Sequence, residues 1–297
     1  MPDRYTHRNM NKIIENKWYI KSRYLFFVLI LSYIIWGIIL VNILPNYFAD
    51  TPDPMSVAFS DYIFYGILFL FLYIFSKKAS INLNSLFGEL QFEYFTSKYI
   101  FIVLPMIALS YTGIYLTFYP LSFWKPEIVK FFMVEIDSKI IWLNGESYKL
   151  ANILSFVSIA IVVPIVEELF FRGFLFTSMA NKWGIKKAIL LSSIFFGMLH
   201  ANVIGTTLVG IVLCVIYLKT KSLFAPIIIH SAINIIGYIL SYFTNLNNTD
   251  DFITQFQGSW GFGLICIIIG IPWIIYFYKK EISNKLFSVP YFQKVRV

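Results

Sequence analysis

Two adjacent acids inside an apolar stretch are the first residues in this sequence that could do chemistry. Glu167 and Glu168 stand in the segment Pro-Ile-Val-Glu-Glu-Leu-Phe-Phe-Arg, which ends at Arg172. On a helix, Glu168 and Arg172 are spaced i, i+4 and can pair, whereas Glu167 points about 100° away from them. Glu167 is therefore the candidate base that activates a water molecule. Glu168 and Arg172 are candidate supporting residues, and the alternative for Arg172 is that its side chain extends to the membrane surface.

Two of the three histidines also lie in apolar stretches. His200 ends the segment Phe-Phe-Gly-Met-Leu-His, and His230 begins the segment His-Ser-Ala-Ile-Asn, which ends at Asn234. His230 and Asn234 share a helix face and supply two donors for the oxyanion of a tetrahedral intermediate. Glu167, His200 and His230 also form a plausible three-ligand set for zinc, although the His-Glu-x-x-His motif is absent. Metal-free activation of water by glutamate is slightly preferred, and zinc remains an open alternative.

The elements that position these residues are predicted to be membrane helices. The chain has 297 residues, of which 58% are hydrophobic and only 13% are charged, whereas soluble domains average about 45–50% and about 25%. This composition argues against a soluble globular protein, a disordered chain or a nucleic-acid binder. A membrane-spanning helix needs about 20 apolar residues. We predict an all-α bundle of about eight spans, near residues 24–44, 57–76, 99–119, 150–176, 187–202, 203–219, 222–243 and 260–278.

The distribution of charge predicts that both termini are cytoplasmic. Lysine and arginine gather in the arm 1–23, in the tail 279–297 and in alternate loops, as the positive-inside rule requires. We expect one membrane domain, 24–278, with its motif core at 150–243. The loop 120–149 is the exception, because its four lysines are balanced by four acids; it forms either a surface helix or a partly ordered loop. The net charge of +8 is thus explained by topology and anionic lipid rather than by nucleic acid.

The polar residues of three predicted spans agree in depth. At about 1.5 Å per residue, Glu167 and His230 lie about 15 and about 14 Å from the inner ends of their helices. His200 and Asn234 both lie about 20 Å from theirs by the same rise. Structural polar residues in separate helices have no reason to lie at one depth, so we predict a single functional site.

The three motifs, in this order on separate helices, resemble those of the CPBP family. That family holds CaaX prenyl-protein endopeptidases and bacterial bacteriocin-processing and Abi-type membrane proteases, often called metalloproteases. The resemblance covers residues 167–234 and implies an eight-helix bundle that hydrolyses peptide bonds within the membrane, at a site open to the cytoplasm. It also implies that Glu167 activates water with help from His200, and that His230 and Asn234 hold the oxyanion. Glu168 and Arg172 would fix the helix and the first glutamate.

Two other functions are compatible with these residues. The bundle could be a non-catalytic scaffold or bacteriocin-immunity protein, or a proton-coupled transporter, since Glu and His relays also occur in transporters. Against a transporter stand the lack of inverted repeats and of paired broken helices. The preferred hypothesis is a multi-pass endopeptidase of a bacterial plasma membrane, acting on a membrane-bound peptide or protein.

Overall fold

The computed structural model describes residues 20–48, 53–136, 142–143, 146–244, 252–283 and 288–292. Most of the predicted N-terminal arm and part of the predicted tail lie outside these residues. The described chain is almost entirely helical, and its one sheet there consists of two-residue strands, β1 (Trp142–Leu143) and β2 (Glu146–Ser147).

Each of the eight predicted spans falls on a helix. These helices are α1 (Ser22–Ile43), α2 (Pro54–Lys78), α4 (Ser97–Trp124), a continuous helix over residues 149–183, α9 (Ile185–Met198), α10 (Val203–Thr220), α11 (Phe224–Thr244) and α13 (Trp260–Tyr278). In the described part of the chain, six are long and apolar enough to cross a membrane. The other two are the 14-residue α9 and α11, whose described apolar stretch is Phe224–Leu240. The prediction of an all-α, multi-pass membrane bundle is confirmed.

Short helices connect the long ones. They are α3 (Leu83–Phe87), α5 (Pro126–Lys130) and α12 (Phe252–Gly258). The predicted loop 120–149 is helical through α5 and the π-helical turn Phe131–Ile136, and then forms the small hairpin. A helical segment is therefore present there, while its position on the outer membrane surface stays a prediction.

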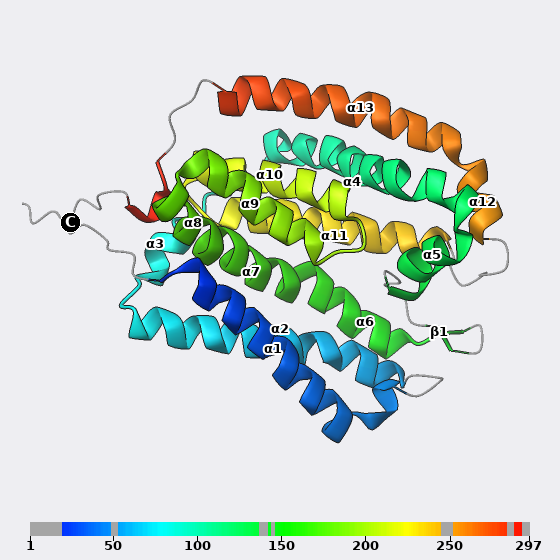
Figure 1. Cartoon of the computed structure of the whole chain (residues 1–297), viewed down its shortest axis with the longest axis horizontal. Coiled ribbons are helices and arrows are strands. Elements are labelled where there is room, and N and C mark those ends of the chain that lie inside the picture. Colours follow the sequence, from blue (N-terminus) through cyan, green and yellow to red (C-terminus); the bar gives the residue numbers. More distant parts are fainter. Residues whose placement is uncertain are drawn as a thin grey trace, which may run out of the picture.

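The continuous helix over residues 149–183 lies in the middle of the bundle. It consists of α6 (Lys149–Val157), α7 (Val163–Glu168) and α8 (Thr177–Trp183), joined by π-helical segments at Ser158–Val162 and Leu169–Phe176. Helices α1 and α2 pack on one side of it and α9 and α11 on the other, with α4 and α13 farther out (Figure 1). Its second half is deeply buried, including Phe170, Phe174 and Met179.

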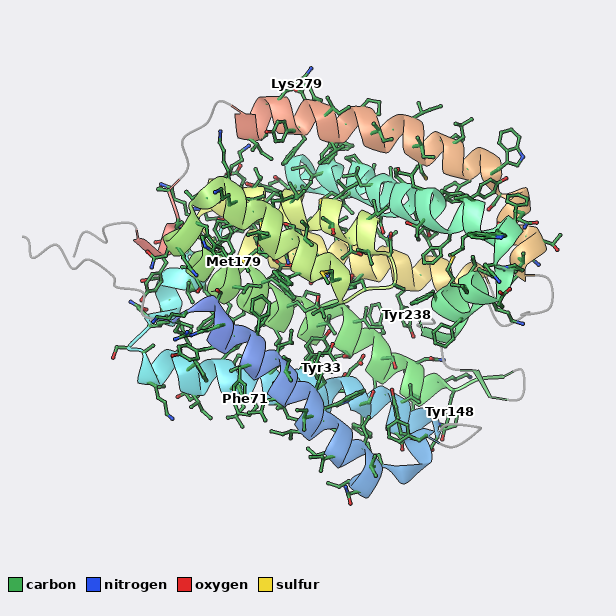
Figure 2. All side chains as sticks on the ribbon, in the orientation of Figure 1. Tyr33, Phe71, Tyr148, Met179, Tyr238 and Lys279 are labelled. Atoms are coloured by element: carbon green, nitrogen blue, oxygen red, sulfur yellow. The ribbon has the colours of Figure 1, made fainter. Side chains whose placement is uncertain are left out.

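The outer helices expose apolar side chains as a lipid-facing surface does. On α1, Ile30, Ile34 and Val41 are each more than half exposed, and α13 shows the same pattern (Figure 2). A soluble monomer rarely exposes so much contiguous apolar surface. The first described helix begins and α13 ends at the same end of the bundle (Figure 1). This arrangement fits the predicted even number of crossings, and the cytoplasmic placement of that end stays a prediction.

Candidate active site

The second glutamate and the arginine form a fully buried ion pair. Arg172 Nη1 lies 2.7 Å from Glu168 Oε1, and the two side chains are 1% and 0% exposed. Arg172 Nη2 donates to the Gly210 carbonyl oxygen at 3.3 Å, and the guanidinium lies 4.3 Å from the centre of the Phe196 ring. The predicted i, i+4 contact is therefore present. The alternative, in which Arg172 extends to the membrane surface, was wrong, because the carboxylate, the carbonyl and the ring satisfy it internally.

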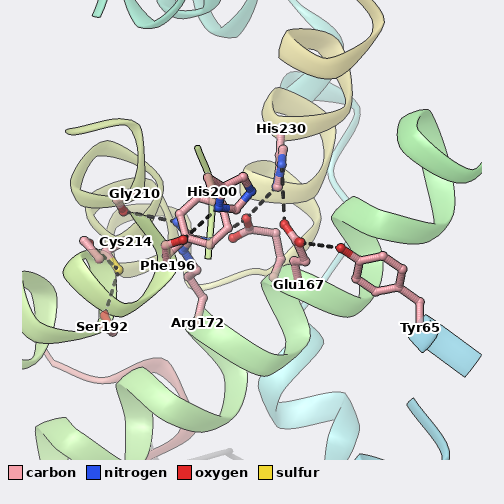
Figure 3. A network of polar contacts seen from close by, with 11 residues as sticks. Tyr65, Glu167, Arg172, Ser192, Phe196, His200, Gly210, Cys214 and His230 are labelled. Atoms are coloured by element: carbon pink, nitrogen blue, oxygen red, sulfur yellow. Dashed lines mark hydrogen bonds and ion pairs between the residues drawn. The ribbon is translucent and has the colours of Figure 1, made fainter. Parts of the chain in front are cut away.

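Glu168 also holds a histidine from another helix. His230 Nδ1, on α11, lies 2.9 Å from Glu168 Oε1 (Figure 3). A carboxylate accepts hydrogen bonds, so this contact places the hydrogen on Nδ1 and fixes the orientation of the ring. Nε2 of the same ring then faces Glu167, with 3.9 Å between Nε2 and Oε2. Glu168 thus orients His230, whereas the resemblance had implied that it fixes Glu167.

Glu167 itself is held by a tyrosine that the motifs did not identify. Its Oε1 accepts a hydrogen bond of 2.6 Å from the Tyr65 hydroxyl on α2 (Figure 3). Its Oε2 is buried and has no hydrogen-bond partner. The sequence signal that could have found Tyr65 is the i, i+4 pair of Asp61 and Tyr65, two polar side chains on one face of the second span.

His200 lies just past the end of α9. Its Nδ1 is 2.8 Å from the Phe196 carbonyl oxygen, which can only accept, so Nδ1 carries a hydrogen and Nε2 carries the lone pair in the neutral ring. The Phe196 ring contacts both site histidines, with centroid distances of 4.8 Å to His200 and 5.8 Å to His230. The structure therefore brings both site histidines and Arg172 against one aromatic ring (Figure 3).

Asn234 is near this group but has a partner of its own. Its Nδ2 donates to the Ile159 carbonyl oxygen at 2.9 Å. That carbonyl lies in the first π-helical segment, where the Val163 amide bonds the carbonyl five residues back. In this register the amide of residue 164 would donate to the Ile159 carbonyl, but residue 164 is a proline and has no N–H. The Ile159 carbonyl is therefore available to Asn234. In an α-helical register Pro164 would leave the Ala160 carbonyl without a partner, and the π-helical register moves that role to Ile159.

The candidate zinc ligands do not converge on one point. Among the described residues, no group of three or more His, Cys, Asp or Glu side chains could hold a metal ion. Nδ1 of His200 and Nδ1 of His230 are each held by protein oxygens, which leaves Nε2 as the free nitrogen of each ring. The donor set Glu167, His200 and His230 is thus not gathered as a zinc site in this structure, and the choice between zinc and metal-free activation of water stays a prediction.

Comparisons with known proteins agree with this region of the chain. Residues 149–236 match the family described as "Rce1-like: Type II CAAX prenyl endopeptidase Rce1-like". The "UPF0177 protein YxdF" of Lactococcus lactis subsp. lactis is 31% identical over 83 residues, which are 27% of this chain and 45% of that protein. The "Putative membrane peptidase YdiL" of Bacillus subtilis is 32% identical over 101 residues, 33% of this chain and 41% of that protein.

These matches cover only part of the chain and part of each relative. The chain covers less than half of the length of either relative, and no solved structure matches it significantly. The family match includes all six residues predicted from the motifs, and it excludes α1, α2, α4 and α13. The resemblance to the CPBP family is confirmed over residues 149–236, where the chain is similar to the Rce1-like type II CAAX prenyl endopeptidases.

Proposed function

We propose that the protein is an intramembrane endopeptidase in which Glu167 activates the water that attacks the peptide bond. One observation carries the proposal: Glu167 Oε2 is buried without a hydrogen-bond partner and faces His230 Nε2 at 3.9 Å. A direct hydrogen bond is shorter than this. A water molecule, or the oxygen of a bound peptide, can contact both atoms.

The proposed reaction needs one proton transfer to the base and one from it. Glu167 Oε2 takes a proton from water while the water oxygen attacks the peptide carbonyl carbon. The tetrahedral intermediate then collapses, the C–N bond breaks, and the proton goes to the leaving nitrogen. His200 Nε2, which keeps its lone pair while Nδ1 bonds Phe196, accepts a hydrogen bond from the same water.

The oxyanion needs donors, and His230 is the first. With hydrogens on both nitrogens, His230 gives one to Glu168 and the other to the oxyanion. In that state the buried group of Glu167, Glu168, Arg172 and His230 has no net charge, which suits a low-dielectric site. Asn234 is the second donor, because its amide has two hydrogens and Ile159 takes one of them.

We place the substrate in the class of membrane-bound peptides or proteins. The name of the matching family makes CaaX-terminated prenyl proteins the first subset to test. The surrounding bilayer brings such a chain to the buried site, because the helices that carry the site expose apolar residues outward.

The experiment compares peptides released in membranes that contain the wild-type chain or the Glu167→Gln variant. We expect a defined set of cleavage products to fall by about a hundredfold or more in the variant, since general-base catalysis contributes at least this much. Glu281→Gln is the matched control, because Glu281 is also buried but is paired with Lys219 at 2.9 Å, outside the site. Equal product levels from the wild type and Glu167→Gln would overturn the proposal and favour the non-catalytic scaffold.

A further inference from the structure

The hydroxyl of Tyr65 comes from a helix that the family match does not include. Tyr65 is on α2, whereas the match covers residues 149–236. Its oxygen lies 2.6 Å from Glu167 Oε1, a distance typical of a hydroxyl that donates to an ionised carboxylate. The site is therefore completed from outside the segment that carries the motifs.

Helix α2 is held against the central helix by further polar contacts. The Tyr62 hydroxyl donates to the Leu154 carbonyl at 2.7 Å, and the Ser158 hydroxyl donates to Asp61 Oδ2 at 3.4 Å. With Tyr65 bonded to Glu167, three contacts within five residues of α2 join two helices that run in the same direction (Figure 1). The rotation of α2 is therefore set over more than one turn, and the Tyr65 hydroxyl is directed at Glu167.

Aromatic packing from α1 supports the same position. The Phe64 ring packs edge-on against Tyr65, with 5.1 Å between centroids, and contacts Tyr33 of α1 at 4.4 Å. The Trp36 indole donates to the Ser60 carbonyl at 3.0 Å, which ties α1 to α2 one turn before Tyr65. Such packing limits the movement of the Tyr65 ring.

We propose that Tyr65 is a positioning residue that selects which oxygen of Glu167 acts as the base. This inference rests on the proposed function. A carboxylate with no partner rotates about its terminal bond, and its two oxygens are then equivalent. With Oε1 held by Tyr65, Oε2 stays directed at His230 Nε2, and Figure 3 shows Tyr65 and His230 approaching Glu167 from different directions.

The hydroxyl keeps this role through the reaction without touching the reacting atoms. When Glu167 takes the proton on Oε2, Oε1 becomes the carbonyl oxygen of the acid and still accepts from Tyr65. The bond to Tyr65 is thus retained in both protonation states, so the orientation of the base need not be re-established in each cycle. Loss of the hydroxyl should therefore slow the chemical step more than substrate binding.

The test is Tyr65→Phe in the full chain, reconstituted in liposomes. The probe is a synthetic form of the membrane peptide whose cleavage depends most strongly on Glu167. We expect kcat to fall by about tenfold to a hundredfold, the range for a misplaced catalytic group, with KM changed less than about twofold because substrate contacts are unaltered. Tyr62→Phe is the matched control, because it removes a hydroxyl from the same helix whose partner is a backbone carbonyl.

Three outcomes separate this inference from the proposed function. If Glu167→Gln cleaves as the wild type does, the proposed function and the inference both fail. If Glu167→Gln is inactive while Tyr65→Phe and Tyr62→Phe have the same kcat, the inference alone fails. If Tyr65→Phe loses kcat and unfolding stability together, and Tyr62→Phe does so equally, the hydroxyl has only a structural role and the inference is overturned.

Discussion

At the scale of single residues, the charged and polar side chains of the site hold one another in place. Arg172 holds Glu168, Glu168 holds His230, and Tyr65 holds Glu167. Among the described side chains of the site, three buried atoms have no hydrogen-bond partner, namely Glu167 Oε2, Glu168 Oε2 and Arg172 Nε. Native proteins leave few such atoms, and they gather where function requires them. The site thus keeps two acceptor oxygens and one donor nitrogen without partners among its buried side chains.

The buried ion pair leads to a stability prediction. Arg172→Met removes the guanidinium and leaves Glu168 as a buried charge, and we expect the free energy of unfolding to fall by about 3–5 kcal/mol. Unfolding in mixed detergent micelles, titrated with SDS, measures the change. The double variant Glu168→Gln, Arg172→Met should recover part of the loss, because both charges are then gone.

An exposed ion pair in the same chain is the control. Lys125 and Glu127 are 3.9 Å apart and half or more exposed, so Glu127→Gln should change stability by less than about 1 kcal/mol. If Glu127→Gln and Arg172→Met lower the free energy of unfolding equally, the buried pair contributes no more to stability than the exposed pair.

At the scale of elements, the length of α9 explains the depth of His200. A 14-residue helix is about 21 Å long, which is too short for a hydrocarbon core of about 30 Å. Because α9 ends early, the chain turns back after 14 residues, and His200 at this turn is half-buried while Leu199 is exposed. The chain then reverses at Asn202, whose side chain accepts from the Gly205 amide and begins α10. The two predicted spans here form a helical hairpin.

That hairpin depends on close contact between α10 and α4, which gives a second prediction. A Cβ on Gly113 of α4 would clash with the backbone of Gly205 and the side chain of Asn202. Because a backbone cannot move aside as a side chain can, Gly113→Ala should cost about 1–3 kcal/mol. Gly66→Ala is the control, since nothing lies within 4 Å of the added atom; it should be neutral or stabilising by up to about 1 kcal/mol. SDS titration of both variants measures the change in the free energy of unfolding. If Gly113→Ala is as stable as Gly66→Ala, α4 and α10 are farther apart than in this structure.

At the scale of the whole molecule, the arrangement of helices sets which ends face the same side. Lys77 lies near the end of α2 and Lys182 near the end of α8, and both helices run toward the same end of the bundle. Gln255 lies on α12, beyond the other end of the bundle. The positive-inside pattern predicts that the first two face the cytoplasm and the third faces outward.

Thiol labelling tests this topology. Cysteines introduced as Lys77→Cys, Lys182→Cys and Gln255→Cys are compared in a background that carries Cys214→Ser and Cys266→Ser, which removes the two native thiols. In intact cells, a membrane-impermeant reagent should label the variant at 255 and leave those at 77 and 182 unlabelled until the membrane is opened. Labelling of all three from outside would contradict the predicted orientation.

The sequence by itself determined the class of protein and most of the candidate site. The composition indicated membrane helices, because a bilayer excludes charge and requires long apolar runs. The contact between Glu168 and Arg172 followed from helix geometry, since residues four apart are neighbours on any helix. All six motif residues lie in the segment that the family comparison matches.

Only the tertiary structure decided which helices face each other and in what rotation. Three contacts of the site join residues far apart in sequence. They are Tyr65 with Glu167, His230 with Glu168, and Asn234 with the Ile159 carbonyl. Helix periodicity fixes the relative directions of side chains within one helix, but not the angle at which that helix meets its neighbour. That angle depends on the packing of whole faces, here on the fit of α2 and α11 against the π-helical segments of the central helix.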